Sequence, residues 1–101
     1  TFTMTPGGPE VDIRCDLALI AVGAIDAAGF STSNMGDANM MAEMIQRAER
    51  TAILADSSKV GRRLFAQVAT LDRADYLVTD SAPDPEFAAA LAQAEVEVVS
   101  P

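Results

Sequence analysis

The residues best suited to chemistry lie in one short segment, Asp56-Ser57-Ser58-Lys59, which a cation-rich stretch follows at residues 61–63. An apolar run at residues 51–54 ends just before this segment, which is typical of a buried strand that delivers a polar loop to a site. The loop offers a flexible cation, two hydroxyls and backbone amides that could face an anion. Lys59 suits a phosphate because its ammonium is a compact charge on a long stem. The alternative is a strand-to-helix turn whose lysine is only solvated.

The composition excludes several classes of function. The 101 residues carry a net charge of −8, so they lack the basic surface that DNA or RNA binding requires. Cys15 is the only cysteine and there is no histidine, which excludes an internal disulfide, the usual zinc sites and His-based triads. No nucleotide-binding glycine motif is present, and we predict no cofactor, no metal and no catalytic residue. With no membrane-length apolar run and no signal-peptide pattern, we expect a cytoplasmic protein without a membrane partner.

The elements that must position the polar loop begin at residue 16. Residues 1–15 are predicted to be an irregular lead-in or the edge of a piece cut from something longer, with a strand fragment around residues 2–4 as the alternative to an irregular start. After residue 16 the hydrophobic pattern alternates between strand-length and helix-length segments. We predict strands at 17–22, 51–55, 76–79 and 96–99, a loop at 23–36, and helices at 37–50 (N-cap Asp37), 61–67 and 84–93 (N-cap Asp84).

This alternation predicts an α/β fold with a parallel, Rossmann-like sheet and crossover helices. In such sheets ligands bind outside the carboxyl ends of the strands. Three of the four predicted strand ends carry a carboxylate, namely Asp26, Asp56 and Asp80. Carboxylates accept hydrogen bonds from sugar hydroxyls, so the pattern indicates a polyhydroxylated ligand. The alternative, which we weigh equally, is that these aspartates only cap turns after strands.

Six segments of the chain together resemble a known family. They are 16–26 (DLALIAVGAID), 29–32 (GFST), 44–45 (MI), 55–62 (ADSSKVGR), 76–80 (YLVTD) and 96–99 (VEVV). Residues 16–100 thereby resemble the carboxy-terminal half of the sugar-sensing domain of DeoR-family bacterial transcriptional regulators. The resemblance implies a fold similar to ribose-5-phosphate isomerase and glucosamine-6-phosphate deaminase. It also implies that DNA is bound through a helix-turn-helix that these residues do not contain.

The resemblance assigns roles to particular residues. Lys59 matches a lysine that approaches the sugar phosphate in the related deaminases, and Asp26 matches an acidic position beside the sugar. Gly23 and Gly29 match loop glycines that let the backbone come close to the ligand. Together with the residues of the polar rim, these form the predicted ligand-binding set: Gly23, Asp26, Gly29, Asp37, Asp56, Ser57, Ser58 and Lys59.

The chain departs from the family pattern in two ways. Family members commonly have Glu near position 37 and Lys near position 41, where this chain has Asp37 and Met41. The loss of that lysine removes a candidate cation. The first half of the sensing domain, which supplies a hydroxyl- and glycine-rich phosphate loop in the related enzymes, is also outside these residues. We therefore expect the chain to hold about half of an effector pocket.

The predicted function is the effector-binding part of a DeoR-type regulator of carbohydrate metabolism. The expected effector is a phosphorylated sugar or a related metabolite, and the expected assembly is a homo-oligomer. Two alternatives come from other classes. A sugar-phosphate isomerase or deaminase would suit the fold, although no histidine and no evident acid–base pair is available. A pure oligomerisation domain with a vestigial pocket is the second.

Overall fold

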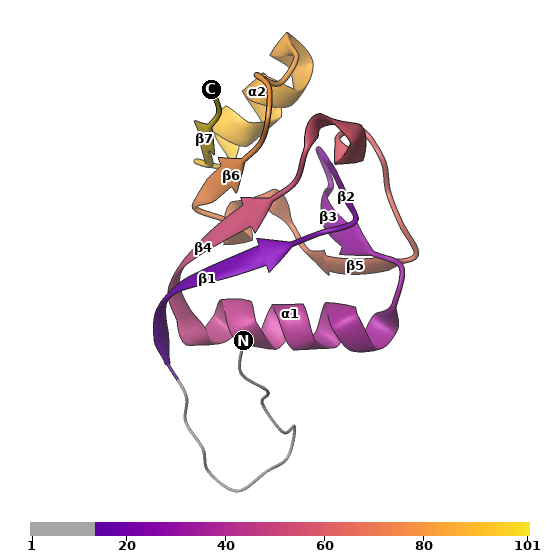
Figure 1. The fold of residues 1–101 in the computed structure, drawn as a ribbon, viewed down its shortest axis with the longest axis vertical. Helices are drawn as coiled ribbons and strands as arrows, with labels where there is room; N and C mark the ends of the chain where they lie inside the picture. Colours follow the sequence, from indigo (N-terminus) through magenta and orange to yellow (C-terminus); the bar gives the residue numbers. More distant parts are fainter. Residues whose placement is uncertain (1–13) are drawn as a thin grey trace, which may run out of the picture.

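The computed structural model describes residues 14–101, which form two small sheets connected by helices (Figure 1). The predicted strand fragment at residues 2–4 and nearly all of the predicted lead-in lie outside the described residues, and Cys15 already belongs to the first strand. In chain order the elements are β1 (Cys15–Ala21), β2 (Ala24–Asp26), β3 (Gly29–Thr32), α1 (Met35–Arg47), β4 (Ala48–Leu54), η1 (Ser57–Lys59), β5 (Ala66–Ala69), η2 (Leu71–Arg73), β6 (Tyr76–Val78), α2 (Pro85–Gln93) and β7 (Glu97–Val99).

The main sheet is parallel and has the strand order β1-β4-β6-β7. This confirms the predicted α/β class with a parallel sheet. Each connection steps to the next strand in the same direction, so right-handed crossovers place every connection on one face. Ile20, Ile53 and Leu77 occupy one row on that face, and all three are buried. Phe87 and Leu91 of α2 belong to the same hydrophobic cluster, which is the core of the domain.

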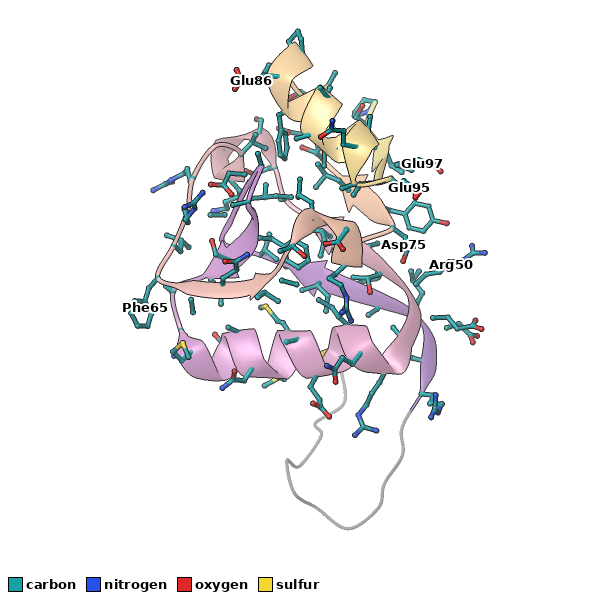
Figure 2. All side chains as sticks on the ribbon, turned by 180° about the vertical axis from the view of Figure 1, so that it is seen from behind. Arg50, Phe65, Asp75, Glu86, Glu95 and Glu97 are labelled. Carbon is teal, nitrogen blue, oxygen red and sulfur yellow. The ribbon has the colours of Figure 1, made fainter. Side chains whose placement is uncertain are left out.

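No element of residues 14–101 covers the opposite face of the main sheet. Its outward rows carry apolar side chains, including Leu17 and Leu19, which are 47% and 60% exposed. Leu54, Val78 and Val99 extend this surface across the other three strands at their carboxyl ends. Figure 1 draws no element in front of β1 and β4, whereas the η2 turn lies before them when the molecule is seen from behind in Figure 2. We call this surface, made of Leu17, Leu19, Ala21, Leu54, Val78 and Val99, the open face.

Helix α1 differs from its prediction at both ends. Its N-cap is Asn34, whose Oδ1 accepts a hydrogen bond from the Asp37 amide at 3.0 Å, so Asp37 lies in the first turn and is not the cap. Asn caps helices as well as Asp does, and here it stands three residues earlier. The helix ends at Arg47 rather than at residue 50 because residues from Ala48 onward pair with β1. Met41, where the family commonly has Lys, is half-buried and packs against the core.

The second sheet corrects two predictions. The segment predicted as a loop at 23–36 contains the antiparallel hairpin β2-β3, and the predicted helix at 61–67 is an irregular stretch followed by β5. Strand β5 pairs with β3. Its residues alternate as is typical of a strand, with Ala66 and Val68 buried and Gln67 exposed. Glycine is required at position 29, where the start of β3 passes close to the end of β5. Its φ is +135°, and a Cβ there would lie 2.2 Å from the Ala69 carbonyl oxygen.

The last crossover follows its prediction closely. Asp84 caps α2 by accepting a hydrogen bond from the Phe87 amide at 2.8 Å, and Pro85 occupies the first turn. Phe87 and Leu91 are buried, as their one-turn spacing predicts. Among the described residues no helix is both long and apolar enough to cross a membrane.

Candidate functional site

A cavity of about 460 Å³ lies at the carboxyl ends of three neighbouring strands, β1, β4 and β6. Its polar lining comes from Asp56, Lys59, Thr79 and Asp80, and its apolar lining from Ala21, Val22, Leu54, Ala55 and Val78. The topology explains this meeting, because parallel strands end on the same edge of the sheet. Asp56 and Asp80, 24 positions apart in the chain, thus flank one cavity with Lys59.

Lys59 is held by the 3₁₀ turn η1. Asp56 caps this turn, its Oδ1 accepting hydrogen bonds from the Ser58 amide at 3.0 Å and from the Ser58 hydroxyl. The Lys59 amide then donates to the Asp56 carbonyl at 3.0 Å. The Ser58 hydroxyl is the largest cause that lowers the pKa of Asp56 below 3.8, and the Lys59 charge lowers it further. Asp56 is therefore an anion at neutral pH, and it lies close to the Lys59 cation.

Asp80 joins the end of β6 to the start of η1. Its Oδ1 accepts a hydrogen bond from the Ser57 amide at 2.7 Å, and its Oδ2 accepts one from the Ser57 hydroxyl at 3.3 Å. The polar loop is thus tied to the neighbouring strand by two bonds to one carboxylate. Asp80 appeared among the predicted strand ends but not among the predicted ligand-binding residues.

The structure brings only part of the predicted set to the cavity. Asp56 and Lys59 line it, and Ser57 and Ser58 lie beside it, bonded to Asp80 and Asp56. Asp37 lies outside the lining, exposed in the first turn of α1.

The remaining three predicted residues, Gly23, Asp26 and Gly29, belong to the hairpin and not to the cavity lining. Asp26 forms an ion pair with Arg63 at 3.0 Å. Gly23 donates its amide to the Ser31 carbonyl at 3.1 Å, and Gly29 lies where β3 approaches β5 closely. The contacts of these three residues are structural ones within the second sheet and its loops.

The lining residues that were not predicted share one property. Apart from Asp80, they are Ala21, Val22, Leu54, Ala55, Val78 and Thr79, and each is at or next to the last residue of a parallel strand. The rule that ligands bind outside the carboxyl ends could have selected them, because each predicted strand end has an apolar residue beside its polar one. Ala21, Leu54 and Val78 also lie in one row of the open face, so the cavity and the open face are continuous.

The charge around the cavity limits what it can do. One cation and two carboxylates line it, which suits a ligand with hydroxyl groups and a single anionic group. Among residues 14–101, no group of three or more His, Cys, Asp or Glu side chains is placed to hold a metal ion. A second group of charged residues, Arg50, Asp75, Glu95 and Glu97, gathers at the amino ends of β4, β6 and β7, the opposite edge of the sheet (Figure 2).

Comparison with known proteins decides the family. The family described as the DeoR C-terminal sensor domain matches residues 11–81, which is more than half of the chain. The chain belongs to this family. It is 35% identical over 85 residues to the HTH-type transcriptional regulator GlpR of Haloferax volcanii and 37% identical over 84 residues to the HTH-type transcriptional repressor GlcR of Bacillus subtilis.

Both of these alignments cover 83% of this chain and 33% of the relative. An uncharacterized HTH-type transcriptional regulator of Bacillus subtilis, YulB, is 40% identical over 72 residues, which are 71% of this chain and 28% of that protein. The chain thus spans about a third of the length of the curated relatives it matches. These relatives are named as HTH-type transcriptional regulators or repressors, which agrees with membership in the sensor-domain family.

Proposed function

We propose that this chain is the effector-binding part of a DeoR-type regulator of carbohydrate metabolism, and that its effector is a phosphorylated sugar or a related metabolite. The observation that supports this is the meeting of Lys59 with Asp56 and Asp80 at one cavity. Lys59 supplies a point charge for a phosphate. Asp56 takes both Ser58 bonds on Oδ1, which leaves Oδ2 to accept a hydrogen bond from a sugar hydroxyl.

The proposal has parts that the family membership leaves open. Residues 16–101 form the carboxy-terminal part of the sensing domain, with the fold likeness to ribose-5-phosphate isomerase and glucosamine-6-phosphate deaminase. DNA is bound through a helix-turn-helix outside these residues, and the relatives named as HTH-type regulators support this. The protein works in the cytoplasm, without catalysis, a cofactor or a membrane partner.

The proposed mechanism is a shift between two arrangements of a homo-oligomer, driven by a difference in effector affinity between them. The open face supports self-association because covering its exposed apolar side chains removes them from water, which lowers the free energy. It also supports coupling to the effector. Leu54 and Val78 belong both to the open face and to the cavity, so packing on the face changes the shape of the cavity.

The test is a thermal-shift screen of sugar phosphates against their unphosphorylated parents. A ligand at about 100 times its dissociation constant adds about 2.7 kcal/mol to the stability of the native state. Stabilisation by one phosphosugar, but not by its parent sugar, is the expected result. An assembled oligomer that no ligand stabilises would favour the pure oligomerisation domain, and turnover of a sugar phosphate would favour the enzyme.

A further inference from the structure

Two backbone amides of the polar loop already donate to carboxylates of the protein itself. In the backbone of η1, the Ser57 amide donates to Asp80 Oδ1 at 2.7 Å and the Ser58 amide donates to Asp56 Oδ1 at 3.0 Å. The next two amides donate to backbone carbonyls, Lys59 to Asp56 at 3.0 Å and Val60 to Ser57 at 3.3 Å. Every amide from Ser57 to Val60 therefore has a partner.

This arrangement narrows how the loop can contact a ligand. A phosphate at the cavity meets the Lys59 side chain, but it reaches the Ser57 or Ser58 amide only if it displaces a carboxylate. Displacing Asp80 would break two hydrogen bonds and leave two anions beside each other. The bonds from Asp80 also fix the start of η1 relative to β6, and η1 carries Lys59.

We infer that Asp80 is a positioning and specificity-determining residue of this cavity, which holds the Lys59 loop in place and excludes ligands that carry a second anionic group. The inference rests on the proposed function and deepens it. It narrows the ligand class to sugars and polyols that carry one phosphate and no second anionic group. Sugar acids and bisphosphates are disfavoured because their second anion would face the carboxylates of Asp56 and Asp80, and Lys59 is the one cation among the described lining residues.

Two substitutions separate the positioning role from the charge. Asp80→Asn keeps an oxygen that accepts from the Ser57 amide but removes the negative charge, whereas Asp80→Ala removes both. Asp16→Asn is the matched control, because Asp16 is exposed near the start of β1, at the opposite end of the strand from the cavity, and loses the same charge. The probes are ribitol 5-phosphate and sorbitol 6-phosphate, each compared with its matched acid, 5-phosphoribonate and 6-phosphogluconate.

Dissociation constants are measured by calorimetry on the intact protein. The wild type should bind an alditol phosphate more tightly than its matched acid. Asp80→Asn should narrow that preference by about fivefold, the factor expected for one like-charge contact screened by water. Asp80→Ala should narrow it too and should also weaken binding of the alditol phosphate. Asp16→Asn should change neither quantity. A structural role alone would not move the ratio of the two affinities.

The outcomes separate the inference from the proposed function. If the wild type prefers alditol phosphates and Asp80→Asn leaves the preference unchanged, the specificity role of Asp80 is refuted while the sensor proposal stands. If the sugar acids bind the wild type as tightly as the matched alditol phosphates do, the exclusion of a second anionic group is again refuted alone. If neither the probes nor any sugar phosphate binds, the proposed function fails and the inference fails with it.

Discussion

The sharpest test of the proposed site is the substitution Lys59→Ala. Lys59 is half-buried at the edge of the cavity and is the only cation among the cavity-lining residues. A hydrogen bond to a charged group contributes about 1.5–3 kcal/mol, so its loss should weaken phosphosugar binding by roughly 10- to 150-fold. We expect the upper part of this range, because the variant would leave Asp56 and Asp80 facing the phosphate without a compensating charge.

The measurement is calorimetric titration of the phosphosugar that the thermal-shift screen identifies. Arg62→Ala provides the control, since it removes the same charge three positions further on, from an exposed residue outside the cavity lining. Binding of the unphosphorylated parent sugar should change little in either variant. The reasoning is refuted if Lys59→Ala binds the phosphosugar as tightly as the wild type. It is also refuted if Arg62→Ala loses as much affinity, because the effect would then be one of net charge and not of the site.

Three further predictions concern packing, assembly and pH. Gly29→Ala should lower the free energy of unfolding, measured in urea, by about 3 kcal/mol, because it adds a steric clash to an unfavourable φ. Gly61→Ala should lower it by less, because Gly61 has φ +81° but open space around it. Equal losses of stability in the two variants would refute the clash. Leu19→Lys on the open face should reduce the oligomer mass measured by light scattering, and an unchanged mass would remove this face as the contact. The pKa of Asp56 is lowered, so its stabilisation is complete above about pH 4 and is lost as pH falls through the lowered pKa. The difference in melting temperature between wild type and Asp56→Asn should therefore be constant from pH 7 to pH 5 and shrink toward pH 3; a difference that changes between pH 7 and pH 5 would contradict this.

The sequence predicted best the elements whose signals are local. Helix α2 begins at the predicted residues because Asp84 and Pro85 suit a helix start through their own side chains. The main-sheet strands were found because their apolar runs have the length of a strand, although one face of the sheet is exposed. The start of α1 was placed too late, since Asn34 and Asp37 are both good caps and only the fold selects between them.

The second sheet could not be predicted from local pattern. Its strands are three or four residues long, and β5 pairs with β3 across more than thirty residues of chain. Leu64 and Val68 also satisfy the spacing of a helix face, so periodicity favoured the wrong element. Residues 66–69 form a strand and not a helix because they pair with β3, which passes close to them at Gly29. This is a contact between distant segments of the chain.

The same limit explains why only part of the predicted set lies at the cavity. Asp56 and Lys59 line it because β4 ends at the edge of the parallel sheet, where the topology rule applies. Asp26 was expected there by the same rule. The chain instead continues from β1 into the hairpin, and Asp26 pairs with Arg63 away from the cavity.

The position of the cavity gives the proposed sensor a physical route from ligand to assembly. The row Ala21, Leu54 and Val78 forms both the apolar lining of the cavity and the carboxyl-end row of the open face. A layer that packs on the open face therefore also borders the ligand, and the two binding events share these side chains. By linkage, an effector that changes how this row packs must change the stability of the assembly by the same free energy. The Leu19→Lys variant tests this link, because weaker assembly must then change effector affinity as well.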